Sequence, residues 1–291
     1  MKIHHLPVLR EEVIEALNLK QNGIYVDATV GLGGHAEHIK EKMGTGGRLF
    51  GIDRDDEALG FAEKRLADKR VVLRRGSFSD MTSLLNADGI SEADGILFDL
   101  GLSMLQIKNP ERGFSFLSDE RLDMRMDRRQ KLSAWEVVNK YPEKDLVRIL
   151  KEYGEERLSS KIARAIIRQR GKKSIDTCSE LSKIIEDVYG GRGRLHPATK
   201  TFQALRIEVN RELDQVRAGL SAASRLLKKG GRLCVISYHS LEDRIAKHFM
   251  ADGSKEGSLK IITKKPITAS SEEMRINPSS RSAKLRVAER I

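Results

Sequence analysis

Five short runs of β-branched and aliphatic residues stand out along the chain, and the first four follow one another at close intervals with amphipathic stretches between them. The runs span residues 23–28, 48–53, 70–75, 94–99 and 231–237. Strands that alternate with helices form a parallel sheet with helices on both of its faces. The pattern therefore predicts an α/β fold.

The segments around the fifth run predict a long helix before it and two more strands after it. The helix is expected to extend from about Leu205 to Lys228, and the two glycines at 230–231 then provide a stop signal. Beyond the run, the segments LKIITKKPITAS and SAKLRVAER are separated by a serine-rich loop that contains proline. We expect this pair of strands to join the edge of the sheet as a hairpin.

The fourth and fifth runs are separated by about 130 residues. A crossover between parallel strands needs only about a dozen residues, so this stretch contains an insert. It shows several helix-like patterns and no convincing strand, which predicts a helical subdomain. The predicted division is a core formed by 1–108 and 204–291, with the insert at 109–203 and basic strands at the C-terminus.

The formal net charge of +11 is unevenly distributed along the chain. Residues 107–203 hold 22 basic and 15 acidic side chains, and residues 254–291 hold 9 and 4, whereas residues 1–106 carry a small acidic excess. Basic segments of this kind are typical of proteins that bind a polyanion. The alternative is a generally basic, well-solvated surface.

Neither the hydropathy nor the cysteines indicate export or membrane insertion. The chain has no run of 18 apolar residues, and its first residues lack the apolar core and cleavage site of a signal peptide. Cys178 and Cys234 lie in unrelated contexts and form no metal-binding motif, so reduced thiols are expected. These features predict a cytoplasmic protein without a membrane span or a bound metal. They do not decide between a monomer and a homodimer.

A glycine-rich turn with the sequence GLGGH at residues 31–35 follows the first run and leads into a helix. Glycines there let the backbone approach a ligand and present amide groups at the helix N-terminus. Asp53 ends the second run, 20 residues after Gly33, and is placed to bind a ribose. The cradle suits NAD(P) or S-adenosylmethionine, and a tight turn without a ligand is the remaining alternative.

Two later segments favour a methyl donor over a dinucleotide. Phe78 follows the third run on the side where an adenine commonly lies, and Asp99 ends the fourth run on a loop that contains glycine. Ligands of open α/β sheets bind at the carboxyl ends of the strands. A methyl acceptor would therefore lie beside Asp99.

Motifs along almost the whole chain, in order, resemble those of the bacterial 16S ribosomal RNA cytosine-N4 methyltransferase family. They include VDATVGLGGHAEHI, GIDRD, GSFSD, DGILFDLGLS, RGFSF, LDMRMD, HPATKTFQALRIEVNREL, ISYHSLEDR and NPSSRSAKLRVAER. The resemblance implies a class I, Rossmann-like methyltransferase fold with an inserted all-helical domain, S-adenosylmethionine as donor, and a decoding-centre cytidine of 16S rRNA in the small ribosomal subunit as acceptor. It also implies cofactor contacts by Gly33, Gly34, His35, Asp53, Phe78, Asp99 and Gln106.

One loop departs from the family's pattern. After the fourth run the family usually reads Asp-Leu-Gly-Val-Ser-Ser-Pro-Gln, whereas this chain has Leu102, Met104 and Leu105 between Asp99 and Gln106. The spacing from Asp99 to Gln106 is kept, so cofactor binding is expected to persist. The missing proline no longer fixes a backbone φ angle, and the path of the loop stays open.

The exocyclic N4 of cytosine is a poor nucleophile because its lone pair is delocalised into the ring. A group that accepts a hydrogen bond from the amine localises this lone pair as a proton is lost. Asp99 is the first candidate, and its alternative role is to bind the amino group of the donor. Tyr238 and His239 are further catalytic candidates, against a helix-start role with Ser240 as N-cap supported by Asp243.

His35 is expected to orient the cofactor loop rather than to act as a base. The insert offers five arginines for RNA phosphates, namely Arg112, Arg121, Arg125, Arg128 and Arg129. The last three are expected to share part of a helical face, with pairing to nearby aspartates as the alternative. Aromatic residues form only 5% of the chain, too few to stack many bases. One extruded base is therefore expected, walled by Phe114, Phe116 and Tyr141, with Trp135 in the core.

Two other functions stay open. An NAD-dependent dehydrogenase would use the same glycine turn, and calorimetry with both cofactors separates it from a methyltransferase. An RNA-binding assembly factor would keep the cofactor pocket without turnover. It would leave no label in RNA after incubation with unmodified small subunits and labelled donor.

Overall fold

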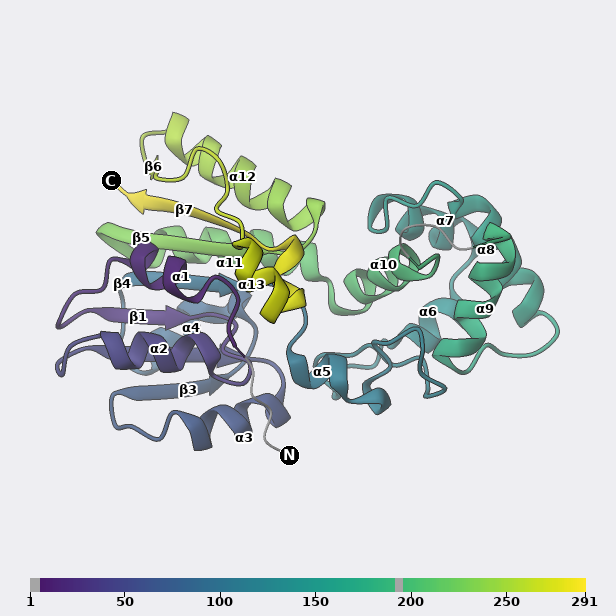
Figure 1. Ribbon diagram of the computed structural model, residues 1–291, viewed down its shortest axis with the longest axis horizontal. Coiled ribbons are helices and arrows are strands. Elements are labelled where there is room, and N and C mark those ends of the chain that lie inside the picture. Colours follow the sequence, from purple (N-terminus) through teal and green to yellow (C-terminus); the bar gives the residue numbers. More distant parts are fainter. Residues whose placement is uncertain (1–5, 192–195) are drawn as a thin grey trace. The chain divides into compact units, whose positions relative to one another are not determined.

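The computed structural model describes residues 6–191 and 196–291. The chain divides into two compact units. Their segments can be followed in Figure 1 by the colours, which give the residue numbers. The first unit consists of Met1–Ser103 and Leu213–Ile291, and the second consists of Met104–Glu212. The first unit is thus built from both ends of the chain, and the second from the segment between them.

A single seven-stranded sheet with the order β3-β2-β1-β4-β5-β7-β6 forms the centre of the first unit. The first five strands are parallel, and β7 runs antiparallel to its neighbours β5 and β6. All five runs of the sequence are strands, which confirms the predicted α/β class. The strands are β1 Ile24–Asp27, β2 Arg48–Asp53, β3 Val71–Arg75, β4 Ala93–Asp99, β5 Leu227–Ser237, β6 Leu259–Ile261 and β7 Lys284–Arg290.

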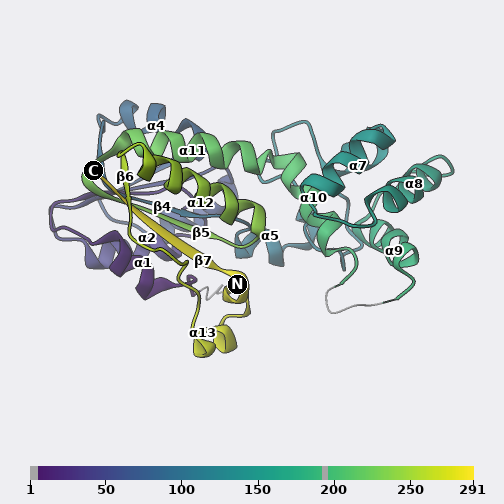
Figure 2. The same cartoon turned by 90° about the horizontal axis from the view of Figure 1, so that it is seen from above.

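Helices cover both faces of the sheet. The helices α4, α11 and α12 share a core with Phe50 and Ile96, whereas α1, α2 and α3 pack with Leu49 and Leu97 on the other face. Successive strand residues point to opposite faces, which is why these neighbours belong to different cores. Figure 2 shows α4 and α11 on one side of the strands and α1 and α2 on the other. The helices are α1 Arg10–Leu17, α2 Gly34–Lys42, α3 Asp56–Arg65, α4 Met81–Ala87, α11 Glu212–Leu226, α12 Ser240–Lys255 and α13 Ser271–Ile276, with 3₁₀ turns η1 Phe78–Asp80 and η3 Pro278–Ser282.

The second unit confirms the expected helical insert. Its helices surround a core of apolar side chains that includes Leu146, Ile162 and Leu181. The only β pairing among the described residues of this unit is an isolated bridge between Arg121 and Thr177. No helix in 6–191 or 196–291 combines the length and the hydropathy needed to cross a bilayer. The helices are α5 Met104–Lys108, α6 Ala134–Lys140, α7 Glu143–Glu152, α8 Ser159–Arg170, α9 Cys178–Tyr189 and α10 Thr199–Asn210, with the 3₁₀ turn η2 Pro110–Arg112.

The prediction of one helix from about Leu205 to Lys228 is wrong. Two helices, α10 and α11, are separated at Arg211, where the backbone has a φ of +51° and leaves the helical conformation. The glycines at 230–231 are no helix stop, because β5 already begins at Leu227, which pairs with Ala93 of β4. The tail strands are confirmed at the sheet's edge, although their connection contains α13 and η3 rather than a plain loop.

The amino end of β4 carries a buried and fully compensated carboxylate. Asp94 accepts hydrogen bonds from Lys20 Nζ at 2.9 Å, from Lys228 Nζ at 3.0 Å and from the Ile24 amide at 3.0 Å. Burial alone would raise the pKa of Asp94, but the amide and the two lysines together hold it below its usual value. This end of the sheet therefore stabilises the negative charge that it buries.

Candidate active site

Three aspartates end neighbouring strands at the carboxyl edge of the sheet. Asp27 ends β1, Asp53 ends β2 and Asp99 ends β4. Because β1 lies between β2 and β4, parallel pairing brings the three carboxyl groups together. Among the described residues, no lysine or arginine is hydrogen-bonded to or ion-paired with any of them. The three carboxyl groups are instead contacted by backbone amides, a tyrosine hydroxyl and a histidine.

The glycine turn is tied to β2 by Asp53. The Gly31 amide donates to Asp53 Oδ2 at 2.8 Å, and the Asp55 amide donates to Oδ1 at 3.0 Å. Gly31 and Gly33 have φ angles of +50° and +80°, where side chains are strained, and a Cβ on Gly33 would lie 3.1 Å from the Leu66 side chain. The segment has the conformation expected of a ligand cradle, and Gly33 directly precedes α2. The ribose contact of Asp53 stays a prediction.

Asp99 has two side-chain partners, one on each oxygen. The Tyr238 hydroxyl donates to Oδ1 at 2.8 Å, and His35 Nε2 lies 3.6 Å from Oδ2. Its own amide donates to Thr29 Oγ1 at 2.7 Å, which fixes the end of β4 beside the glycine turn. The side chain is 20% exposed. Burial raises the pKa of Asp99 to about 7, opposed by the Tyr238 hydrogen bond and assisted by the charge of Glu242.

Tyr238 is held in place as a neutral donor. Burial, and then the charge of Asp99, raise the pKa of Tyr238 well above its usual value, so the hydroxyl keeps its proton near neutral pH. The ring lies against Gly101, whose φ is +104° and where a Cβ would come within 3.2 Å of Tyr238 Cδ2. The loop after β4 therefore accommodates the tyrosine that contacts Asp99.

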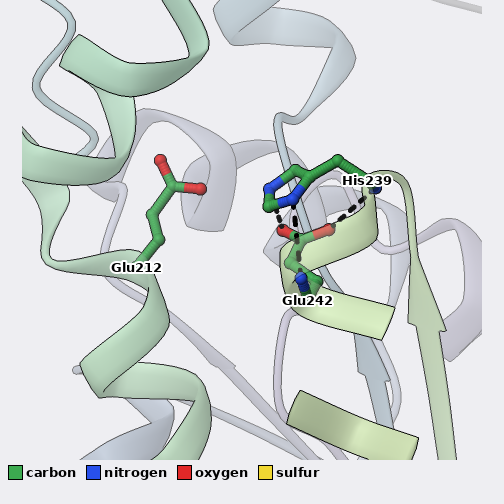
Figure 3. Close-up of side chains that lie close together, drawn as sticks. All are labelled: Glu212, His239 and Glu242. Carbon is green, nitrogen blue, oxygen red and sulfur yellow. Dashed lines mark hydrogen bonds and ion pairs between the residues drawn. The ribbon is translucent and has the colours of Figure 1, made fainter. Parts of the chain in front are cut away.

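His239 is engaged by the start of α12, as Figure 3 shows. Its Nδ1 accepts from the Glu242 amide at 3.5 Å, and its Nε2 lies 3.2 Å from the Glu242 carboxylate. The expectation that Ser240 is the N-cap, supported by Asp243, is wrong, because the helix begins one residue earlier than that role requires and His239 caps it. The Glu242 carboxylate also accepts from the Tyr238 amide at 2.9 Å. A catalytic role of His239 stays a prediction.

Phe78 and Gln106, two of the predicted cofactor contacts, belong to the 3₁₀ turn after β3 and to helix α5. Phe78 is 8% exposed, and its ring meets Phe98 edge to face at 5.5 Å, so most of it belongs to the core. The Arg54 guanidinium lies 5.9 Å from the centre of the same ring. Gln106 lies in α5 of the second unit. The contacts of Phe78 and Gln106 with a cofactor stay predictions.

Asp27 is a residue that the sequence reasoning missed. It is 1% exposed, and its Oδ1 accepts from the Thr29 amide at 3.2 Å. Burial raises the pKa of Asp27 to about 7, against the Thr29 amide and with the charges of Asp99 and Asp53. The available signal was positional, since Asp27 ends its run directly before the glycine turn, just as the other two aspartates end theirs.

The prediction that Arg112 binds RNA phosphates is wrong. Its side chain is 1% exposed, and Nη2 donates to the carbonyl oxygens of Arg125 at 3.1 Å and Met126 at 3.0 Å. A guanidinium with several donors can satisfy backbone carbonyls that no other group reaches. Arg112 therefore supports the fold of the second unit.

Two of the remaining four arginines pair with nearby aspartates. Arg125 pairs with Asp123 at 2.7 Å and Arg129 with Asp127 at 2.8 Å, as the alternative interpretation expected. The prediction that Arg125, Arg128 and Arg129 share a helical face is wrong, because residues 121–133 form no helix. Arg121 and Arg128 are exposed, and their phosphate contacts stay predictions.

The aromatic side chains of the second unit contact one another and the core. Phe116 stacks on His196 at 4.2 Å, and the Tyr141 hydroxyl donates to Glu208 Oε1 at 2.9 Å. Phe114 and Trp135 pack against the same core. These contacts fix the rings within the unit, and their role as walls for a flipped base stays a prediction.

The doubly covered sheet, with its glycine turn and its acids at the carboxyl edge, has the Rossmann-like fold of class I methyltransferases. A sequence model of the MraW methylase family matches residues 2–291, and the chain belongs to this family. It is 49% identical to the ribosomal RNA small subunit methyltransferase H of Caldicellulosiruptor bescii over 99% of both chains. The protein of that name from Persephonella marina is also 49% identical, over 99% of this chain and all of its own. A candidate rRNA methylase structure from Clostridium thermocellum shares the fold, with a TM-score of 0.50 and 16% identity over 99% of this chain and all of that one.

Proposed function

We propose that the protein methylates N4 of a cytidine in the decoding centre of 16S ribosomal RNA, in the small ribosomal subunit and in the cytoplasm. The names of its relatives support a small-subunit rRNA as substrate. The cytidine and its N4 atom rest on the motif resemblance. The observation that carries the chemistry is the Asp99 carboxyl group, held by Tyr238 at the edge where ligands of such sheets bind.

The residues at this edge fit the donor. S-adenosylmethionine supplies an electrophilic methyl group and carries a positively charged sulfonium. No lysine or arginine among the described residues neutralises Asp27 or Asp99, and burial raises the pKa of both to about 7. A bound cation would favour the charged forms of these two carboxyl groups. Gly31 and Gly33 keep the turn free of side chains, and Asp53 fixes its position.

Asp99 has the properties of a proton acceptor for the amine. With a pKa of about 7 a large fraction of the carboxyl is ionised at neutral pH, and the ideal pKa of a general base lies near the working pH. The Tyr238 hydroxyl occupies Oδ1 and fixes the orientation of the group. Formation of the N4–methyl bond would break the bond between the methyl carbon and the donor's sulfur, whose electron pair stays on the sulfur. One N–H bond of the amine breaks and the Asp99 carboxylate takes this proton, which leaves the methylated amine neutral.

Transfer of label to RNA tests the proposal. Purified protein is incubated with labelled donor and small subunits that lack the modification, and the nucleosides are then separated and identified by mass spectrometry. We expect one N4-methylated cytidine per subunit. Label on carbon 5, on a ribose or on no nucleoside would overturn the proposal. Calorimetry should detect S-adenosylmethionine and not NAD, and Asp53→Ala should weaken the donor's binding.

A further inference from the structure

We infer that residues 262–284, which connect β6 to β7 and include Lys284 as the first residue of β7, form a docking surface for the phosphates of the RNA substrate. We call this segment the edge connection. The inference rests on the proposed function, because it names where the RNA backbone lies beside the site. It concerns only the first unit.

The charge of the edge connection is strongly biased. It holds five basic and two acidic side chains. Four of the basic residues are exposed, and among the described residues these four have neither an ion-pair nor a hydrogen-bond partner. They are Lys264, Lys265, Arg275 and Arg281. One of the two acids, Glu273, holds the N-terminal segment, because its Oε1 accepts a hydrogen bond from the Leu9 amide at 2.8 Å.

The arginines of the neighbouring strands β5 and β7 instead form ion pairs and hydrogen bonds within the protein. Arg286 is 8% exposed and donates to Asp243 at 2.7 and 3.2 Å. Arg290 donates to the Ser258 carbonyl at 2.8 Å, and Arg232 pairs with Glu289 at 2.9 Å. The four exposed cations of the edge connection make no such contribution, which leaves them available for a polyanion.

The edge connection lies at the same end of the sheet as Asp99. In the register of β5 and β7, Ser237 lies opposite Lys284, and Tyr238 follows Ser237 directly. Arg281 precedes Lys284 by three residues, so its backbone lies near the start of β7. Met274 of α13 packs in the same apolar cluster as Tyr238. Figure 1 shows α13 in yellow at the end of the sheet where β7 begins.

The edge connection is anchored on the first unit. Besides the Glu273 contact, Asn277 Nδ2 donates to the Leu6 carbonyl at 3.0 Å, and an isolated bridge joins Ile267 to Leu285. None of the α13 residues is fully buried. An anchored backbone presents its cations from fixed positions, so binding costs less ordering of the chain.

The composition of the segment indicates phosphate contact instead of base recognition. Residues 262–284 contain no aromatic side chain, so they offer no platform on which bases stack. Lysine and arginine bind phosphates without reading sequence and release counterions as they do so. The expected signature is therefore a salt-dependent contribution to RNA affinity that leaves the chemical step unchanged.

A matched pair of double variants tests the inference. Arg275→Ala/Arg281→Ala removes two charges from the edge connection, and Lys69→Ala/Lys229→Ala removes two exposed charges at the opposite, amino end of the strands. We expect the first variant to raise the KM for small subunits about tenfold with kcat unchanged, and to lower the slope of log affinity against log salt by roughly 1.5. The control should match the wild type in both measurements.

Two independent readouts separate the possible failures. Filter binding reports RNA affinity without turnover, and donor calorimetry with thermal melting shows that the variants are folded. If the first variant keeps the KM and the salt slope of the control, the docking surface is refuted while the proposed function stands. If the wild type produces no N4-methylcytidine, the proposed function fails, and the salt slopes from filter binding still decide whether this surface binds RNA.

Discussion

The carboxyl groups at the two ends of β4 differ in their partners and in the direction of their pKa shifts. Asp94 at the amino end is 7% exposed and accepts from two lysines and an amide, and its pKa lies below the usual value. Asp99 at the carboxyl end has a tyrosine hydroxyl and a histidine as its side-chain partners, and burial raises its pKa to about 7. The two carboxyl groups are only five positions apart on one strand, yet among the described residues lysines pair with Asp94 and not with Asp99.

The difference separates stability from function. A compensated carboxylate strengthens the fold and has no capacity left for a ligand. An uncompensated one costs stability and can bind a cation or take a proton, which is how binding sites commonly trade stability for activity. We therefore expect variants of Asp99, Tyr238, Asp27 and Asp94 to rank differently by their loss of turnover than by their loss of stability.

Asp99→Asn should cause the largest loss of turnover. The amide keeps a hydrogen-bond acceptor but cannot take the N4 proton, and general base catalysis is worth about 10²- to 10⁴-fold. Single-turnover methylation should fall at least about 100-fold with the donor Kd changed less than about threefold. If the donor Kd rises in proportion to the loss of rate, Asp99 binds the donor's amino group instead.

Tyr238→Phe should lower turnover by about tenfold, which corresponds to one ordinary hydrogen bond of about 1.4 kcal/mol. The hydrogen bond from Tyr238 opposes the rise of the Asp99 pKa. Its removal should move the midpoint of the pH–rate profile to higher pH. A lower rate with an unmoved midpoint would assign Tyr238 a merely structural role.

Asp27→Asn should change turnover only a few-fold but alter how stability depends on pH. The pKa of Asp27 is raised in the folded protein from 3.8 to about 7, so its contribution to stability is lost as pH rises through this window. The variant lacks this loss, which amounts to about 1.4 kcal/mol for each unit of pKa shift. Urea unfolding at pH 5 and pH 8 should show a smaller difference for the variant than for the wild type, and equal differences would refute the assignment.

Asp94→Asn should leave turnover within about twofold of the wild type and lower the free energy of unfolding by about 1–3 kcal/mol, because charge-assisted hydrogen bonds to two lysines are lost. The pKa of Asp94 is lowered in the folded protein, so its contribution is present near neutral pH and is lost as pH falls through that pKa. Denaturant unfolding at pH 7 and pH 3 measures this. Unchanged stability at pH 7 would show that the lysine pair does not stabilise the fold.

Local sequence signals were enough to predict the sheet and the edge of the site. Strands and helices differ in the period of their apolar residues, so Asp53 and Asp99 were correctly predicted at strand ends. The glycines of GLGGH indicate a turn, and Gly33 lies directly before a helix as predicted. The contact of Tyr238 with Asp99 was not predictable in this way. It depends on the register that places Asp99 beside Ile236 across β4 and β5.

The predictions that were wrong have different physical causes. Arg112 was expected at the surface because charged residues are seldom fully buried, yet the backbone path of residues 125–126 surrounds it with carbonyls. The break at Arg211 carries no glycine or proline that would announce it. The cap at His239 lies one residue from the predicted one, within the usual uncertainty of helix ends. The burial of Arg112 thus depends on tertiary contacts that no local pattern contains, whereas the cap at His239 is a local contact with Glu242.

The pH dependence of single-turnover methylation tests the role of Asp99 most directly. The acceptor must be ionised, so the wild-type rate should rise about tenfold per pH unit below pH 7 and level off above it. The residual rate of Asp99→Asn should lack this transition. A wild-type rate that is flat between about pH 5.5 and 8.5, or a rise that persists in Asp99→Asn, would contradict the account.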